Sequence, residues 1–199
     1  MSKEFFNHKS EKWDDITDHD SNIIREVVGG FPDLSNPAIL DVGAGTGVMV
    51  PFLKDKYGEK AKITELDFAE KMIKVNQRKH ANLTNIEYVV GDIYDYPVPT
   101  NKYDLIVCYS VFPHFSDKKK VLKKFHKLLR EAGSLIIFHS QSRQEINNMH
   151  KTAGKEVSTD RLPSAGEVVG RAVKLGYQLV KAKDDNRIYL LQFKKGESG

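Results

Sequence analysis

Short apolar runs alternate with amphipathic segments through the middle of the chain. Five runs have the length and composition of buried strands, at residues 38–42, 62–67, 86–92, 103–112 and 134–139. The segments between them have the apolar spacing of helices, at residues 48–58, 69–80 and 117–133. Pro51 suits a first helical turn, Asp117 suits an N-cap, and Gly133 is expected to end the third helix. This order predicts a parallel sheet whose strands are joined by helical crossovers.

The two ends of the chain depart from this alternation. Residues 1–30 are expected to form an N-terminal helical cap, and the polar residues 140–162 are predicted to form a substrate lid. A helix is expected near residues 164–175, followed by a strand pair joined at residues 184–186.

We therefore expect a single domain over residues 1–199 with a doubly wound, Rossmann-like α/β fold. Its sheet should be mostly parallel and seven-stranded, with a C-terminal antiparallel hairpin.

Charge and composition narrow the classes of function. The net charge of +4 is mild, and the basic residues 118–120 and 123–124 lie within a predicted helix, which is typical of a solvated helix face. The single cysteine, Cys108, rules out a disulfide framework and suits a reducing compartment. Residues 1–15 lack the apolar core of a signal peptide, and no apolar run has membrane-spanning length. We expect a cytoplasmic protein with no membrane partner and leave its oligomeric state open.

The loop after the first apolar strand carries three glycines at alternate positions, in the string Asp-Val-Gly-Ala-Gly-Thr-Gly of residues 41–47. Dinucleotide loops need a third glycine where this chain has Val48. Alternate glycines let the backbone approach a flat nucleoside closely. The Asp41 carboxylate suits a ligand with ammonium and sulfonium charges and would repel a pyrophosphate.

This string resembles the first motif of the class I S-adenosylmethionine-dependent methyltransferases, and further matches cover most of the chain. Residues 63–73, 89–97, 103–115 and 128–138 resemble the family's later motifs, with Ala132-Gly133-Ser134 as a departure in the last, and residues 5–15 resemble its N-terminal segment. The resemblance implies S-adenosyl-L-methionine as the cofactor. It assigns the cofactor to residues in or beside these motifs, namely Trp13, Asp41, Gly43, Ala44, Gly45, Gly47, Asp67, Phe68, Asp92, Ile93, Tyr109 and Ser110.

Within that set, the resemblance implies that Asp67 accepts the ribose hydroxyls, that Asp92 accepts the adenine amino group, and that Trp13 closes over the cofactor. Simpler interpretations stay open for each motif: a tight turn for the glycines, a helix N-cap for Asp67, a turn residue for Asp92 and core packing for Trp13.

The acceptor side is less clearly marked. We expect the ends of the fourth and fifth strands to form the substrate wall, with His114 or His139 as a general base and Arg143 binding an anionic group. A metal held by His114, His139 and His150 is an alternative without a short ligand motif to support it, and so is a polar surface lid with no catalytic part.

The predicted function is methyl transfer from S-adenosylmethionine to a small-molecule acceptor by in-line displacement. We do not expect nucleic acid as a partner, because residues 109–114 lack the Asn/Asp-Pro-Pro-aromatic string of base amino methyltransferases. An RNA or protein methyltransferase, a nicotinamide-dependent oxidoreductase and a non-catalytic cofactor-binding protein remain as alternatives.

Overall fold

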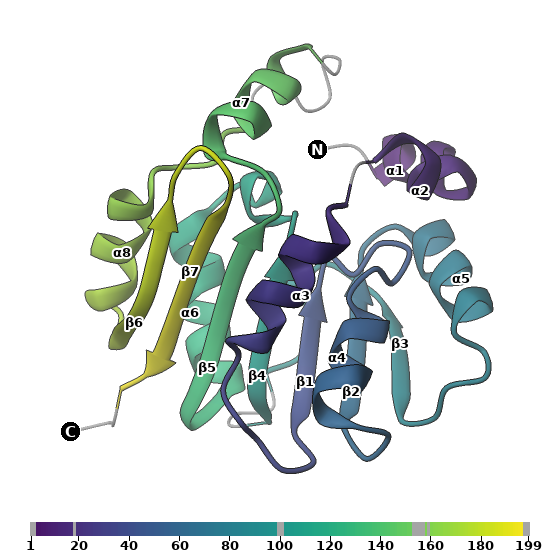
Figure 1. The fold of residues 1–199 in the computed structure, drawn as a ribbon, viewed down its shortest axis with the longest axis horizontal. Coiled ribbons are helices and arrows are strands. Elements are labelled where there is room, and N and C mark those ends of the chain that lie inside the picture. Colours follow the sequence, from purple (N-terminus) through teal and green to yellow (C-terminus); the bar gives the residue numbers. More distant parts are fainter. Residues whose placement is uncertain (1–2, 18, 99–101, 153–157, 159, 197–199) are drawn as a thin grey trace.

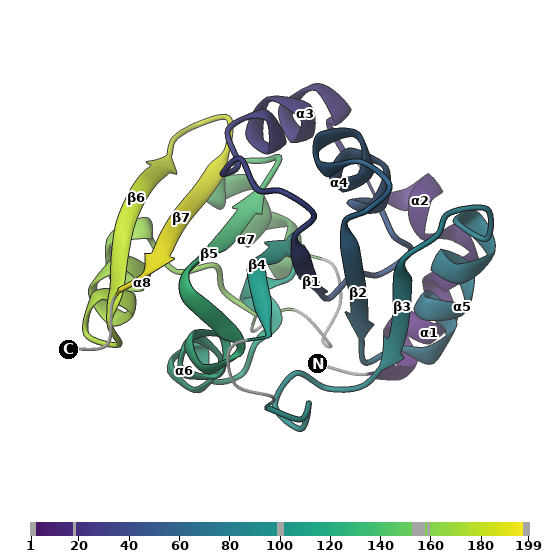
Figure 2. The ribbon, with the colours of Figure 1, turned by 90° about the horizontal axis from the view of Figure 1, so that it is seen from below.

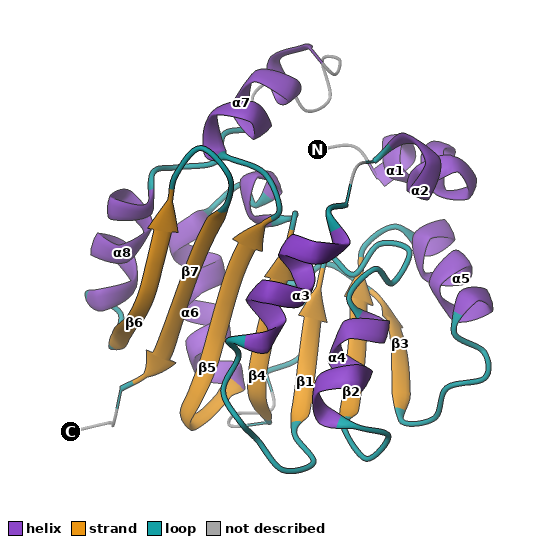
Figure 3. Cartoon of the chain, viewed as in Figure 1, coloured by secondary structure: helices purple, strands orange, loops and turns teal. Residues whose placement is uncertain are grey.

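The computed structural model describes residues 3–17, 19–98, 102–152, 158 and 160–196. One seven-stranded sheet runs through this part of the chain in the order β3-β2-β1-β4-β5-β7-β6 (Figures 1 and 3). Its strands are β1 (Ala38–Val42), β2 (Lys62–Asp67), β3 (Ile86–Val90), β4 (Tyr103–Tyr109), β5 (Leu129–His139), β6 (Tyr177–Asp184) and β7 (Tyr189–Lys195).

Strand direction divides the sheet into two parts. Strands β1 to β5 pair in parallel, whereas β7 pairs antiparallel with both β5 and β6. The predicted Rossmann-like fold, with a mostly parallel sheet and a C-terminal antiparallel hairpin, is confirmed. In parallel strands the carboxyl ends meet at one edge, so β1, β2 and β4 deliver their last residues to the same place.

Helices cover both faces of the sheet (Figure 2). Helices α3 (Ser21–Gly29) and α4 (Val50–Tyr57) bury their apolar residues on one face, and α6 (Lys118–Leu128) and α8 (Ala165–Val173) cover the other. Helix α5 (Glu70–Lys79) packs against β2 and β3. Burial on both faces explains why the central strands are apolar along almost their whole length.

Most of the local signals for helix ends work as expected. The Asp117 carboxylate accepts a hydrogen bond from the Lys120 amide (2.9 Å), and Gly58, with a φ of 75°, ends α4. The prediction that Gly133 ends the third crossover helix is wrong. Helix α6 ends at Leu128, and β5 begins at Leu129 with extended backbone.

The cause of that early end is the pairing of β5 with β4. Leu129 pairs with Tyr103, and the ladder resumes only where Ser134 pairs with Leu105. The residues between form a bulge in which Ala132 has a φ of 59°. Strand β4 also ends earlier than expected, at Tyr109, because Ser110 has a φ of 53° and a 3₁₀ turn, η2 (Phe112–His114), follows.

Short helices stand above the carboxyl ends of the strands (Figure 1). On one side lie α1 (Lys3–Lys9), η1 (Ser10–Lys12) and α2 (Trp13–Ile16), which dock on α5, and on the other lies α7 (Arg143–Thr152). The predicted cap and lid include these elements, while residues 1–2, 18, 153–157 and 159 of those segments lie outside the described part. No helix among the described residues combines the length and apolarity that a bilayer crossing needs.

Candidate active site

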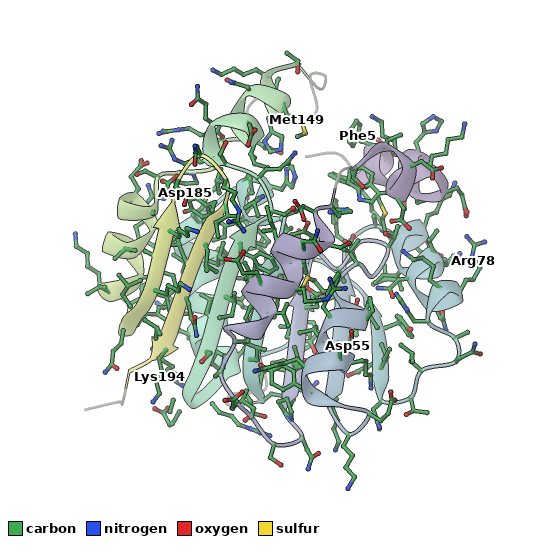
Figure 4. All side chains as sticks on the ribbon, in the orientation of Figure 1. Phe5, Asp55, Arg78, Met149, Asp185 and Lys194 are labelled. Atoms are coloured by element: carbon green, nitrogen blue, oxygen red, sulfur yellow. The ribbon has the colours of Figure 1, made fainter. Side chains whose placement is uncertain are left out.

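A cavity of about 770 Å³ opens at the carboxyl ends of β1, β2 and β4. Its walls come from the glycine loop, from the ends of β2, β4 and β5, and from α1, α2 and α7. Phe5 on α1 and Met149 on α7 face each other across the gap above the sheet (Figure 4). The volume lies in the range of about 300–1,000 Å³ that is usual for small-molecule sites.

The glycine turn forms the floor of the cavity. Gly43 and Gly45 have φ angles of 69° and 54°, where residues with a side chain are strained. A Cβ on Gly43 would lie 2.3 Å from Cγ2 of Val111, whereas a Cβ on Gly45 would meet only the Gly43 carbonyl oxygen, at 4.0 Å. Gly45 therefore leaves open a space that a methyl group would fill, and a ligand can approach the backbone there.

The third glycine has a different position. Gly47 does not line the cavity, and a Cβ there would lie 2.3 Å from Oδ1 of Asn76. The structure thus gives Gly47 a packing role under α5 and does not place it beside the predicted ligand.

Three buried carboxyl groups lie at the ends of β1 and β2. Burial and the charge of Asp67 raise the pKa of Asp41 from 3.8 to about 7, and burial raises the pKa of Asp67 to about 6. Burial and the charge of Asp41 raise the pKa of Glu65 as well. Oδ2 of Asp41 is buried without a hydrogen-bond partner among the described residues. A ligand with positive charge would supply what these groups lack.

The Asp67 carboxylate also holds the turn in place. Its Oδ2 accepts a hydrogen bond from the Gly45 amide (2.9 Å), and its Oδ1 accepts one from the Ala69 amide (2.8 Å). Each oxygen retains a lone pair for a ligand hydroxyl. Asp92 is exposed after β3, and one of its oxygens accepts the Tyr94 amide (2.9 Å).

These observations fit S-adenosyl-L-methionine. The open glycine turn leaves room for the nucleoside beside the backbone, and the unpartnered oxygen of Asp41 suits the cationic end. The available oxygens of Asp67 and Asp92 suit the hydroxyl groups and the amino group. The remaining predicted cofactor residues, Trp13, Ala44, Phe68, Ile93, Tyr109 and Ser110, also line the cavity. That each of them binds the cofactor stays a prediction.

The N-terminal helices are tied directly to the glycine turn. Oδ1 of Asp14 accepts the Thr46 hydroxyl (2.5 Å), and its Oδ2 pairs with the Lys79 ammonium (2.6 Å). Trp13 lies next to Asp14, with its ring 5.3 Å from that of Phe6. Thr46 is almost fully buried and lines the cavity. Sequence reasoning missed both Asp14 and Thr46, although the motif matches that singled out Trp13 and the glycines place them beside those residues.

Three histidines line the acceptor end of the cavity. The His114 and His150 rings lie 5.0 Å apart, and His139 is fully buried beside them. Nδ1 of His114 donates to the Asp160 carboxylate (2.7 Å), and Nδ1 of His150 donates to the Asp160 carbonyl oxygen (2.8 Å). Sequence reasoning did not identify Asp160. Among the described residues, no group of three or more side chains is arranged to hold a metal ion.

A second polar network crosses the same wall. The Tyr109 hydroxyl lies 2.9 Å from Nδ1 of His19 and 2.9 Å from the Ser140 hydroxyl. Arg143, in contrast, does not line the cavity. Its Nε donates to both oxygens of Asp184 (2.9 and 3.1 Å), at the end of β6. The structure therefore places Arg143 outside the cavity in which we expected it to bind the substrate.

Comparison with known proteins agrees with this geometry. The family model described as "Methyltransferase domain" matches residues 39–133, which include the glycine turn and the ends of β2, β3 and β4. A SAM-dependent methyltransferase from Aquifex aeolicus has the same fold, with a TM-score of 0.74, 19% identity and coverage of 98% of this chain and 99% of that one. Residues 39–133 thus match a methyltransferase family, and the described part of the chain has the fold of the class I S-adenosylmethionine-dependent methyltransferases. The cofactor of this family is S-adenosyl-L-methionine.

Curated methyltransferases are also similar to this chain. Malonyl-[acyl-carrier protein] O-methyltransferase of Priestia megaterium is 27% identical over 172 residues, which cover 84% of this chain and 62% of that protein. Demethylmenaquinone methyltransferase of Staphylococcus epidermidis is 33% identical over 97 residues, 49% of this chain and 40% of that protein. The chain thus spans less than two thirds of the length of these curated relatives.

The fold is shared more widely still. A chain from the complex between the Haloferax volcanii Trm112 methyltransferase activator and its methyltransferase partner superposes with a TM-score of 0.81. It is 16% identical and covers 96% of this chain and 98% of its own length. At this identity the likeness concerns the fold alone.

Proposed function

We propose that this chain is a methyltransferase that transfers a methyl group from S-adenosyl-L-methionine to a small-molecule acceptor. One observation carries the proposal: a single cavity joins the glycine turn and its buried carboxyls to the histidines at the ends of β4 and β5. A cavity lined by both sets of residues supports the proposal, because a cofactor and an acceptor would lie side by side in it.

The residues of the chain suit a displacement in which positioning matters most. When bound, S-adenosyl-L-methionine supplies a methyl group on a sulfonium, which the acceptor takes as the carbon–sulfur bond breaks and leaves its electron pair on sulfur. The backbone at Gly45 and the carboxyls of Asp41 and Asp67 would hold the cofactor. Apolar side chains from α1, α2 and α7 would exclude water from the cavity, and the walls would align the acceptor.

The relatives support an acceptor group of small size, since one is named for demethylmenaquinone and another for a malonyl group that an acyl-carrier protein holds. The cap over residues 1–30 and the lid over residues 140–162 belong to the same proposal, because α1, α2 and α7 contribute side chains to the cavity wall. The alternative acceptor, an RNA or a protein, was suggested by the basic residues of α6. No described residue of α6 lines the cavity.

A binding measurement and a turnover assay test the proposal in two steps. The binding measurement is calorimetry. S-adenosylhomocysteine and NAD are titrated separately into the protein, and we expect only the former to bind, with Asp67→Asn weakening it and exposed Asp95→Asn serving as the matched control. Turnover is then measured by S-adenosylhomocysteine release with small molecules and with RNA at rising salt. Binding of NAD alone would refute the proposed cofactor, and salt-sensitive methylation of RNA would refute the proposed acceptor.

A further inference from the structure

The side chain of His114 lines the cavity and is fixed by a hydrogen bond on the side of the ring that faces away from it. Its Nδ1 donates to Oδ2 of Asp160 at 2.7 Å, and the side chains of the two residues are only 12% and 14% exposed. A carboxylate can only accept, so the hydrogen of the neutral ring sits on Nδ1. Nε2 then carries a lone pair and makes no hydrogen bond to any described residue. His114 lines the cavity and Asp160 does not, so Nε2 is the nitrogen available to a ligand.

The other two histidines are less suited to taking up a proton. His139 is fully buried, neither of its ring nitrogens has a partner among the described residues, and burial lowers its pKa to about 3. His150 is held by the carbonyl oxygen of Asp160, which carries no full charge to balance an imidazolium, and burial lowers its pKa. Among these three histidines, His114 alone has a carboxylate partner within the described part of the chain.

Asp160 is itself anchored. Burial would raise its pKa, but the hydrogen bond and charge of His114 outweigh burial and lower it. Two residues farther on, Leu162 exchanges two hydrogen bonds with the Asn147 side chain on α7, at 2.8 and 3.1 Å. The carboxylate is therefore ionised and fixed. The charged or titratable groups nearest to the pair are His139, His150, Lys118 and, toward the glycine turn, Asp67.

Apolar side chains also stand beside His114. The Phe6 ring packs edge-on against the His114 ring, with the ring centroids 5.8 Å apart. Phe6 also contacts the ring of Trp13. Two large apolar side chains at the cavity remain exposed, Ile16 at 54% on α2 and Met149 at 45% on α7. Exposed apolar groups beside a cavity suit a ligand whose body is apolar.

We propose that His114 is the general base of this site, that Asp160 is its positioning residue, and that the acceptor is an apolar ring compound with an ionisable hydroxyl group. The inference rests on the proposed function. An acceptor that has no proton to lose would need no base, so a histidine held by a carboxylate points to an acceptor that loses a proton, and a ring hydroxyl is the group of this kind that we propose. The hydroxyl gives its proton to Nε2, and the oxygen keeps the electron pair of that bond and becomes the nucleophile. The Asp160 carboxylate balances the imidazolium until the proton leaves to water.

The probe for this proposal is 4-nitrophenol, which has an apolar ring and an ionisable hydroxyl, and whose phenolate absorbs visible light. It is added to the complex of the protein with S-adenosylhomocysteine, at the pH where half of the free probe is ionised. In the wild-type complex we expect the ratio of phenolate to phenol to be about tenfold higher than in free probe, because the imidazolium stabilises the anion.

Three variants separate the roles. His114→Asn keeps an amide donor for Asp160 and lacks the second nitrogen, so the bound probe should return to the ratio of the free probe. Asp160→Asn should give a partial loss, and ¹⁵N NMR should show that the Nδ1–H form of His114 is no longer the sole tautomer. His8→Asn, an exposed histidine of α1 outside the cavity, should match the wild type.

The outcomes distinguish this inference from the proposed function. If S-adenosylhomocysteine does not bind the wild-type protein, the proposed function fails. If it binds but the bound probe is no more ionised than free probe, or His114→Asn leaves the ionised fraction unchanged, the base and the acceptor class are refuted while the cofactor site stands. The ionised fraction of the probe bound to the wild-type protein is enough to refute the inference. A variant that fails to fold therefore does not leave the inference untested.

Discussion

Replacing Asp41 by asparagine should remove a penalty that the ligand-free protein carries above neutral pH. The carboxyl is almost completely buried, and its pKa of about 7 lies far above the ordinary value of 3.8. The folded state therefore binds a proton that the unfolded chain has already released, and the stability due to this proton is lost as the pH rises through about 7.

The magnitude follows from the same two values. Between pH 5 and pH 8 this one group should cost the wild type about 3 kcal/mol of unfolding free energy, which the asparagine variant does not lose. For a chain of this size, that corresponds to about 6–12 °C in Tm. The Tm of Asp41→Asn, measured relative to the wild type, should thus be about 6–12 °C higher at pH 8 than at pH 5.

Thermal unfolding followed by circular dichroism at both pH values measures this difference, with exposed Asp95→Asn as the control whose relative Tm should stay constant. Adding S-adenosylhomocysteine at pH 8 should then raise the Tm of the wild type more than that of Asp41→Asn, because the carboxylate gains a cationic partner only in the former. Equal Tm differences at pH 5 and pH 8 would refute the reasoning that Asp41 is a buried, unpaired carboxyl.

Three further predictions follow from the same site. Gly45→Ala should lower Tm by a few degrees, because alanine is strained at a φ of 54°. It should also weaken S-adenosylhomocysteine binding by at least about tenfold in calorimetry, since its methyl group fills the open space; unchanged affinity would contradict that position. His139→Gln should abolish a loss of about 3 kcal/mol between pH 6.5 and pH 4 in urea titrations, because the buried ring must stay neutral while the unfolded ring protonates. Asp14→Ala should expose residues 3–16 to proteolysis by removing the bond to Thr46, an effect that Asp15→Ala should not reproduce.

Much of the fold follows from patterns that are local in the sequence. The periods of apolar residues located every strand, and the glycine turn and Asp67 could be placed together because parallel strands end at one edge of the sheet. The C-terminal part of the α6 prediction failed because residues 129–133 have a helical composition. Their pairing with β4 is a long-range contact that outweighs local preference.

The site was predicted less completely, for the same reason. The hydrogen bond from His114 to Asp160 spans 46 residues, and that from Thr46 to Asp14 spans 32, so no local spacing reveals either one. Arg143 was assigned to the substrate from its position just after β5. Its side chain instead pairs with Asp184, which lies 41 residues farther along the chain at the end of β6.

The position of β7 has a consequence for how the chain is made. β7 is the last described strand in the sequence, yet it lies between β5 and β6 and bonds to both. Until residues 189–195 leave the ribosome, β5 has an open edge and β6 has no neighbour at all. An unpaired edge attracts other strands, so the emerging chain is exposed to misassembly until β7 has paired with β5 and β6. Residues 189–195 thus complete the sheet by pairing with β5 and β6 at the same time.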